Sequence, residues 1–133
     1  SKMATTTASL SINSPDISGD VIAISKTTQL KKAGVSTGLD QTTGVGKKIT
    51  TATSQYTLFP QSSYTDNKAH KIYIRVASNN VTEYVTLTIG SQSVGRIYGG
   101  DFAFLPWDGT ADVKLTPSVS TSLAVEYFLA FEV

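Results

Sequence analysis

The stretch that decides the fold is the end of the chain, residues 121–133, which reads T-S-L-A-V-E-Y-F-L-A-F-E-V. Every second side chain is apolar, and the positions between them carry two glutamates, two alanines and Phe128. A period of two indicates a strand, because successive side chains of a strand point to opposite faces. We predict a long strand with one face on a core, placed either centrally or at an edge to which another subunit can add. The core-facing positions are Leu123, Val125, Tyr127, Leu129, Phe131 and Val133.

Shorter stretches of the same kind precede this strand, separated by turns such as Asp108-Gly109. Between residues 17 and 24, a helix through Ile17, Val21 and Ile24 is an alternative to a strand. Short strands separated by frequent turns are typical of sandwiches and barrels. We therefore predict an all-β fold: a single-domain antiparallel β-sandwich over residues 1–133, jelly-roll-like, with eight to ten strands. The predicted strands are 4–14, 21–30, 49–59, 71–77, 81–89, 94–98, 102–105, 111–116 and 121–133.

Within these strands, the parity of the apolar residues predicts which side chains face the core. Alternation places one parity inward and leaves the other for threonine, serine and charged residues. The residues predicted to face inward are Ile22, Ile24, Leu30, Ile72, Ile74, Val76, Val85, Leu87, Ile89, Phe102, Phe104, Val113 and Leu115.

The composition narrows the class of protein. A length of 133 residues suits one domain, with a core that needs neither disulfides nor a metal. The net charge of +1 argues against nucleic acid as a specific partner. No apolar run approaches the roughly 20 residues that span a bilayer. The chain has 19 threonines and 16 serines, a hydroxyl-rich composition that is common in β-rich virion and extracellular proteins.

Two segments are predicted to be flexible. Ser1 and Lys2 precede Met3 and are interpreted as an expression scar or, with Met3, as a flexible tail, so that synthesis would be cytoplasmic. Residues 33–46 hold four glycines among threonines and form a loop bracketed by two lysine pairs. Long loops are usually functional or disordered, so we predict that this loop and the N-terminal segment contact other subunits. The candidate contact residues in the loop are Gly34, Gly38, Leu39, Asp40, Gly44 and Gly46.

Residues with catalytic or metal-binding chemistry are few and poorly spaced. His70 is the single histidine, and there is no cysteine. Residues 91–95, S-Q-S-V-G, lack the first glycine of a hydrolase elbow, and 44–48, G-V-G-K-K, lack two residues of a phosphate loop. The alternative is a small hydrolase that uses His70, Asp66 and a serine. We predict instead that the protein is not an enzyme, with no catalytic residue, no cofactor and no metal.

Aromatic residues are the remaining candidates for a binding site. Tyr98, Trp107 and Tyr64 form a candidate aromatic surface, because exposed rings on a sandwich can stack on a sugar. The competing interpretation is that Trp107 closes one end of the core together with Phe102 and Phe104. The first interpretation predicts a carbohydrate-binding or adhesin-type module, and the second predicts packing alone.

Two stretches carry a resemblance to a known class of protein. Residues 86–109, T-L-T-I-G-S-Q-S-V-G-R-I-Y-G-G-D-F-A-F-L-P-W-D-G, and residues 124–132, A-V-E-Y-F-L-A-F-E, resemble small virion structural proteins of tailed bacteriophages, particularly the marine type. The resemblance implies a β-sandwich without an active site, located in the virion after synthesis in the host cytoplasm. It also implies that the partners are copies of the chain itself and other virion proteins. Neither a membrane nor a specific nucleic acid is expected, and a host glycan is an additional candidate partner.

Overall fold

The structure is a computed structural model that describes residues 5–133, so the predicted scar or tail at residues 1–3 lies outside the described residues. The described chain is built from strands, apart from one short 3-10 turn, Gln61–Ser63. The strands are β1 (Thr7–Ser14), β2 (Ile22–Gln29), β3 (Gln41–Thr42), β4 (Gly46–Thr50), β5 (Tyr56–Phe59), β6 (His70–Val76), β7 (Tyr84–Ile89), β8 (Gln92–Tyr98), β9 (Phe102–Trp107), β10 (Val113–Pro117) and β11 (Leu123–Phe131).

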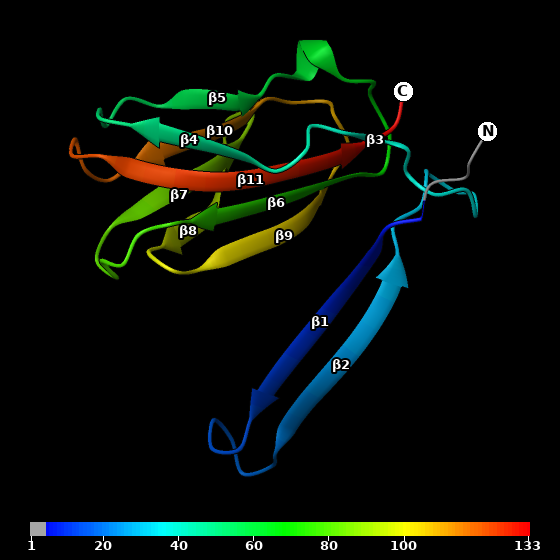
Figure 1. The fold of residues 1–133 in the computed structure, drawn as a ribbon, viewed down its shortest axis with the longest axis horizontal. Helices are drawn as coiled ribbons and strands as arrows, with labels where there is room; N and C mark the ends of the chain where they lie inside the picture. The colour runs from blue at the N-terminus through cyan, green and yellow to red at the C-terminus, as the bar shows by residue number, and fades with distance from the viewer. Residues whose placement is uncertain (1–4) are drawn as a thin grey trace.

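Strands β3 to β11 form a two-layered body with jelly-roll connectivity (Figure 1). One sheet has the order β5-β10-β7-β8, and the other places β11 between β6 and the pair β3 and β4, with β9 outside β6. All pairings are antiparallel, and the chain crosses between sheets at every connection from β4 to β11 except the β7–β8 hairpin. This arrangement is the double-sheet jelly roll. The predicted all-β, jelly-roll-like sandwich is thereby confirmed.

The described residues form eleven strands rather than the predicted eight to ten, because the region before Phe59 contains more short strands than its sequence indicates. The predicted strand 49–59 is two strands, β4 and β5, and the predicted loop 33–46 contains β3. Both β3 and β4 pair with the same edge of β11, so they act as one interrupted strand of the sheet.

The core lies between the two sheets and is built by the alternation that the sequence shows. In β6, the inward residues Ile72, Ile74 and Val76 are fully buried, and the residues between them are half-buried. The buried core cluster comprises Phe59, Ile72, Ile74, Val76, Val85, Leu87, Ile97, Trp107, Val113, Leu115, Leu123, Val125 and Leu129. The predicted inward parity is therefore confirmed for β6, β7, β10 and most of β11.

The prediction for β9 is wrong. Phe102 and Phe104 point outward and are 62% and 45% exposed, whereas Trp107 is buried in the core. Both parities of this strand are apolar, so alternation alone did not distinguish them. Pairing with β6 sets the inward parity, because Leu105 lies opposite the buried Ile72 and Trp107 lies opposite the buried His70.

Strand β11 is central, which excludes the predicted alternative of an edge strand. It pairs with β6 along one side and with β3 and β4 along the other. Near its end both faces are covered, because Leu129 lies in the main core and Ala130 packs on Leu30 and Leu39. Val133, which was predicted to face the core, is exposed.

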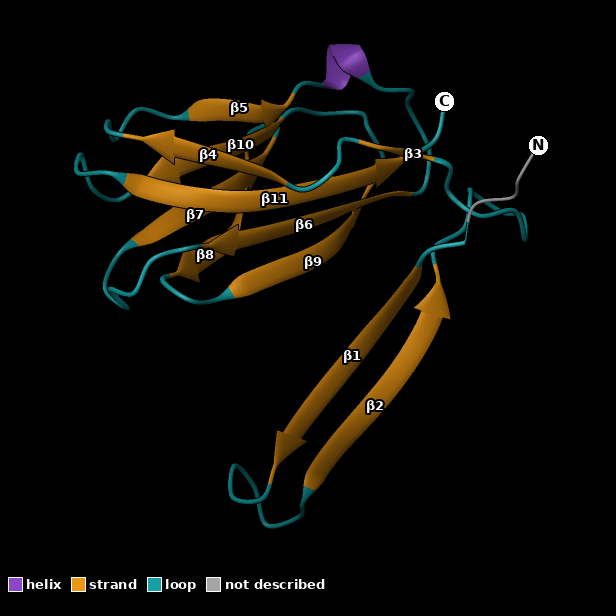
Figure 2. Ribbon diagram, in the orientation of Figure 1, coloured by secondary structure: helices purple, strands orange, loops and turns teal. Residues whose placement is uncertain are grey.

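Strands β1 and β2 form a hairpin that projects from one end of the body, as Figures 1 and 2 show. They pair only with each other, so they lie outside both layers of the sandwich. The alternative helix through Ile17 and Ile24 is absent from the described residues, where Ile24 lies within β2. We call residues 7–29 the arm and strands β3 to β11 the body.

The phenol of Tyr56 predicts a dependence of stability on alkaline pH. Its hydroxyl is buried without a hydrogen-bond partner among residues 5–133, and burial raises the pKa of Tyr56 to about 12. Because the folded state disfavours the phenolate, this contribution to stability is full below pH 10 and is lost as pH rises through 12. Tyr56→Phe removes the titrating group.

We expect Tyr56→Phe to be at least as stable as the original chain at pH 7, because no hydrogen bond is lost. Urea unfolding at pH 7 and pH 11 measures both effects, and the variant should lose less stability at pH 11. Tyr84→Phe, on the outer face of the body, is the matched control. Equal alkaline losses in the original chain and Tyr56→Phe would contradict the assignment.

Candidate assembly surface

The register of the arm separates apolar from polar side chains. Ile12 lies opposite Ile24, and Leu10 lies opposite Lys26 on the same face. On the other face, the Ser9 and Thr27 hydroxyls form a cross-strand hydrogen bond of 3.0 Å. Side chains alternate along both strands, so one face is mainly aliphatic and the other is lined with hydroxyls. We define the arm face as Ala8, Leu10, Ile12, Ile22 and Ile24.

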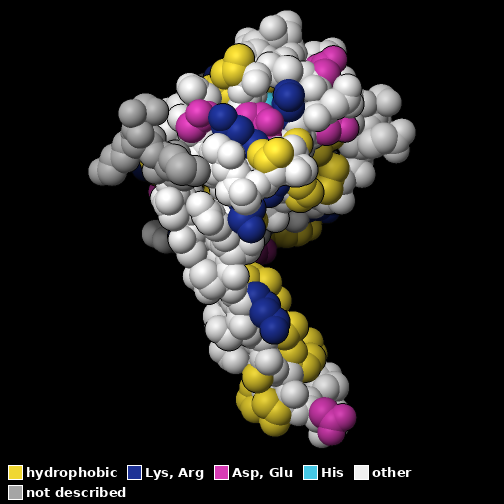
Figure 3. Space-filling view, turned by 90° about the vertical axis from the view of Figure 1, so that its right-hand side faces the viewer, with side chains coloured by type: hydrophobic (Ala, Val, Ile, Leu, Met, Phe, Trp, Pro, Cys, Tyr) yellow, Lys and Arg dark blue, Asp and Glu magenta, His cyan; other side chains and the backbone are white. Residues whose placement is uncertain are grey.

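The arm face is substantially open to solvent in the single chain. Leu10, Ile12 and Ile24 are 47%, 44% and 40% exposed. Figure 3 shows hydrophobic side chains gathered along one side of the arm, with a lysine among them and acidic groups at the tip. A two-stranded hairpin is only marginally stable alone and gains stability by packing an apolar face on another layer. This face is therefore the strongest candidate for a contact with another molecule.

A second apolar surface lies on the outer side of the sheet that contains β9. The register places Phe102 beside Arg75 and Phe104 beside Tyr73, all on the outward parity. The same parity continues through Glu126 to Lys47 on the neighbouring strands. We define the sheet face as Lys47, Lys71, Tyr73, Arg75, Phe102, Phe104, Glu126 and Phe128. It combines aromatic rings with three basic side chains and one acidic side chain.

Tyr73 is held in place at the centre of the sheet face. Its hydroxyl donates a 2.8 Å hydrogen bond to the Glu126 carboxylate, and its ring centroid lies 6.4 Å from that of Phe102. Burial, followed by the bond to Glu126, raises the pKa of Tyr73. The neutral phenol donates to the single carboxylate of this face, where three basic side chains outnumber that one acidic group.

The base of the arm and the sheet face enclose an open groove of about 570 Å³. The arm contributes Ala8, Leu10 and Lys26, with neighbouring serine and threonine residues. The body contributes Tyr73, Phe102 and Phe104. The two apolar surfaces thus face a common space near the base of the arm, and the arm face continues beyond it.

The predicted contact loop anchors the arm to the body. Leu39 is buried with Leu30 and Ala130, and its backbone N–H donates to the Leu30 carbonyl at 3.0 Å. Gly34 has a φ of +72° in the turn that follows the arm. The Asp40 carboxylate lies 3.1 Å from the Lys32 ammonium. The predicted flexible loop thus includes a hydrogen-bonded segment with a buried anchor at Leu39.

The glycines of this loop differ in accessibility. Gly34 is exposed, Gly38 is buried and Gly44 is half-buried. Gly46 begins β4 beneath the Tyr127 ring, where an added Cβ would overlap the ring atoms. Close packing against Tyr127 thus accounts for the glycine at position 46. Burial with Leu30 and Ala130 accounts for the leucine at position 39. Exposed Gly34 and Asp40 remain predicted contact residues.

His70 is fully buried at the end of the body to which the arm is anchored, and backbone groups bind both nitrogens of its ring. Its Nε2 lies 2.9 Å from the Thr65 carbonyl oxygen, and its Nδ1 lies 3.3 Å from the Glu132 backbone nitrogen. A carbonyl only accepts and a backbone N–H only donates, so Nε2 carries the proton and Nδ1 accepts. Both ring nitrogens are occupied by backbone groups, so His70 has no nitrogen free to activate a serine.

The Glu132 side chain, which sequence analysis missed, joins the end of β11 to the base of the arm. Its Oε2 accepts hydrogen bonds from the backbone N–H groups of Ala33 at 2.8 Å and Ala69 at 3.4 Å. The Lys68 ammonium lies 3.9 Å from Oε1. The carboxylate is buried, and these donors compensate for its desolvation. The alternation in 121–133 places Glu132 on the parity opposite the main core, and it does not show that the turn after the arm covers that side chain.

The candidate aromatic surface is not one surface. Trp107 is only 3% exposed, and its indole N–H donates to the Ala111 carbonyl at 2.9 Å. The Tyr64 ring packs edge-on against Trp107 at 5.4 Å and Phe131 at 5.0 Å. Trp107 and Tyr64 therefore close one end of the core, whereas Tyr98 lies in β8 of the opposite sheet. The proposed stacking role of Trp107 is wrong because its faces are covered.

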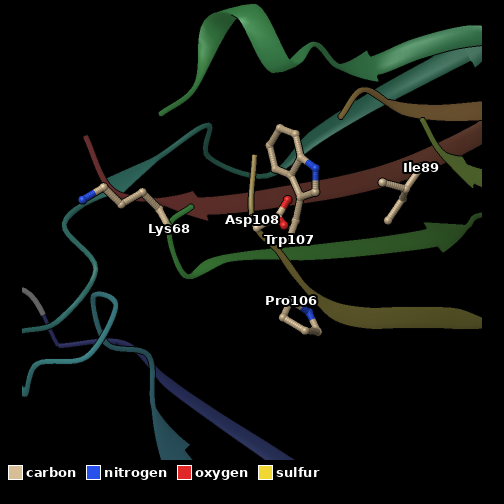
Figure 4. A pocket seen from close by; sticks show the side chains of 5 residues that line it. All are labelled: Lys68, Ile89, Pro106, Trp107 and Asp108. Atoms are coloured by element: carbon tan, nitrogen blue, oxygen red, sulfur yellow. The ribbon is translucent and has the colours of Figure 1, made fainter. Parts of the chain in front are cut away.

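A shallow hollow lies beside Trp107 where β9 ends (Figure 4). Lys68 extends away from Asp108 in this view. The Asp108 carboxylate accepts hydrogen bonds from the Thr110 hydroxyl at 2.7 Å and the Thr110 backbone N–H at 3.0 Å, which lower the pKa of Asp108. The hollow is lined by Lys68, Ile89, Pro106, Trp107 and Asp108. The Asp108 carboxylate thus stabilises the turn in which Asp108 lies.

Within the described range 5–133, no cluster of three or more histidine, cysteine or acidic residues is placed to hold a metal ion. Nor does this part of the chain contain a helix with the length and apolar character needed to cross a membrane. The chain matches no known protein family, no curated protein and no solved structure.

Glu132→Ala tests the junction between the arm and β11. The change removes a carboxylate that accepts from two partly buried backbone N–H groups, and hydrogen bonds to a charged group are among the stronger ones, so we expect the free energy of unfolding to fall by about 1–3 kcal/mol. Amide hydrogen exchange should accelerate at Ala33 and Ala69. Glu126→Ala, within the preceding strand β11, is the control and should leave both amides protected. Unchanged exchange at both amides in Glu132→Ala would contradict this role.

Proposed function

We propose that the protein is a non-enzymatic structural protein of a tailed bacteriophage virion that acts through protein–protein assembly. It is a capsid-associated, decoration or tail-associated component. The observation that carries this proposal is the arm, which holds an exposed aliphatic face outside the sandwich. A soluble chain that keeps such a face on a preformed hairpin has a surface suited to burial against another protein.

The fold and the sequence support the virion assignment. Jelly rolls occur in viral capsid proteins, and they also occur in lectins and cupins, so the fold alone does not choose between them. The hydroxyl-rich composition and the resemblance of residues 86–109 and 124–132 to phage virion proteins favour the first class. The engaged ring nitrogens of His70 and the engaged carboxylate of Asp108 favour a role without catalysis.

The composition of the particle tests the virion role. We expect mass spectrometry of purified phage particles to detect this chain at a fixed stoichiometry to the major capsid or tail protein. Immunogold labelling should place it at one type of position on the particle. A non-structural protein from the same infection, followed through the same purification, controls for carry-over. Absence of the chain from purified particles would contradict the virion role.

A carbohydrate-binding or adhesin-type module is the second candidate function, and one cluster favours it. Tyr84 and Tyr98 lie with ring centroids 5.0 Å apart, and the Arg96 guanidinium lies 4.3 Å from the Tyr84 ring centre. Arg96 also donates to the Tyr98 hydroxyl at 3.1 Å. These half-exposed rings and an exposed cation provide both a stacking surface and hydrogen-bond donors for a sugar.

A glycan array separates this second candidate from the first. If the cluster binds sugar, Tyr98→Ala should reduce binding at least tenfold while the fold is retained, because it removes half of the tyrosine pair. Tyr73→Ala, on the opposite outer face, is the matched control and should bind sugar as the original chain does. Absence of glycan binding by the original chain, or equal binding by Tyr98→Ala, would eliminate the second candidate.

A further inference from the structure

The arm face is left partly uncovered by its own body. The arm base is tied to the body through Leu30 and Leu39, and Figure 1 shows the distal half of the arm running away from the body. Leu10 lines the groove near the sheet face, and Ile12 and Ile24 lie farther along the hairpin, yet all three side chains remain 40–47% exposed. The distal half of the arm is therefore open to contact with a second molecule.

We propose that the arm face docks on the sheet face of a second copy of this chain, in a reciprocal exchange of arms. The inference rests on the proposed assembly role and names its first partner. Each subunit carries both surfaces: aliphatic residues on the arm, and aromatic residues led by Phe102 and Phe104 on the sheet. The arm face of each chain can therefore pack on the sheet face of the other. Two copies that pack in this way form a self-complementary pair, as a two-fold interface requires.

The tip of the arm is complementary in charge to the sheet face. The turn at the tip of the arm carries Asp16 and Asp20, and the only basic residue between 7 and 29 is Lys26. On the sheet face, Lys47, Lys71 and Arg75 outnumber Glu126, whose carboxylate already accepts from Tyr73. An arm laid across this face brings its acidic tip toward a basic surface. The apolar side chains of the arm face and the sheet face then supply the contact area. The charges favour one orientation of the arm.

The dimensions favour a reciprocal exchange over a single docking. An eight-residue strand is about 26 Å long and two paired strands are about 10 Å wide, so the arm covers about 260 Å². Counting both surfaces, one docked arm buries about 520 Å², which is less than a stable interface requires. Two arms exchanged about a two-fold axis bury about 1,000 Å², the lower limit for a specific interface. The smallest closed assembly is therefore a dimer.

Sedimentation equilibrium of the intact chain tests the dimer directly. We expect a mass of twice the 14.1 kDa of one chain at micromolar concentration. The double variant Ile12→Thr, Ile24→Thr keeps β-branched residues in the hairpin but makes the arm face polar, and Phe104→Thr does the same to the sheet face. Each variant should raise the dimer dissociation constant at least tenfold. A monomeric original chain, or unchanged dimerisation in both variants, would overturn the proposal.

Two control variants separate loss of docking from general damage. Ser11→Thr, Ser25→Thr changes the directly opposed pair on the polar face of the arm. Val94→Thr changes an exposed apolar residue on β8 of the other sheet. Both controls should dimerise as the original chain does. Circular dichroism and urea unfolding at submicromolar concentration establish that the test variants remain folded, and a control that dissociates as readily as Phe104→Thr would overturn the assigned surfaces.

Cross-linking between differently labelled chains distinguishes arm exchange from any other dimer. The chain has no cysteine, so Ile12→Cys in one population and Phe104→Cys in another each provide a single thiol. After mixing, a short bis-maleimide reagent should link an Ile12→Cys chain to a Phe104→Cys chain. Ser11→Cys, on the opposite face of the arm, should link to Phe104→Cys at least fivefold less. Equal yields from Ile12→Cys and Ser11→Cys would overturn the docking.

The two proposals fail in different ways. A monomeric chain that is nevertheless present in purified particles would overturn the exchange of arms and leave the virion role intact. An arm-exchanged dimer that is absent from purified particles would overturn the virion role and leave the exchange intact.

Discussion

The pairing of β11 along both of its sides is the constraint on which the rest of the structure depends. Its partners β3, β4 and β6 are distant in sequence, so this one strand brings the middle and the end of the chain into one sheet. The inner face of β11 completes the core, and Ala130 near its end packs against the base of the arm. The Glu132 carboxylate, one residue after the strand, fixes the turn at Ala33. The direction of the arm is therefore a consequence of the last strand of the body.

The sequence predicts the sheets well where only one parity of a strand is apolar. In β6 and β7, threonine, tyrosine or charged residues separate the aliphatic ones, so burial on one face follows directly from the alternation. Strand β9 has apolar residues on both parities, and side-chain size suggests Phe102 and Phe104 as the inward pair. The structure buries Leu105 and Trp107 more deeply because their positions opposite Ile72 and His70 place them on the core side. Register with a neighbouring strand is information that one strand's sequence does not contain.

In the candidate site, too, some features follow from the local sequence pattern and others depend on contacts between residues far apart in the chain. The alternation in 7–14 and 22–29 predicts a strand with an apolar face, but it does not say what covers that face. Ile24 was predicted to face a core and is instead exposed on the arm. Leu39 and Glu132 were missed as structural anchors, because each is buried by segments far away in the chain. Leu39 has no periodic neighbours from which burial can be inferred, and for Glu132 the alternation indicates only the face opposite the main core.

The abundance of serine and threonine has a physical explanation on the arm. An exposed aliphatic hairpin risks uncontrolled pairing with other strands, and it is only marginally stable by itself. On this arm the second face is covered with hydroxyls, including the bonded Ser9 and Thr27 pair, which keep that face soluble and support the register. The hairpin is already paired in the single chain, so the proposed docking does not have to include the full entropy cost of ordering both strands. Preorganisation lets a contact of limited area contribute to assembly, and the polar face restricts that contact to one side of the arm.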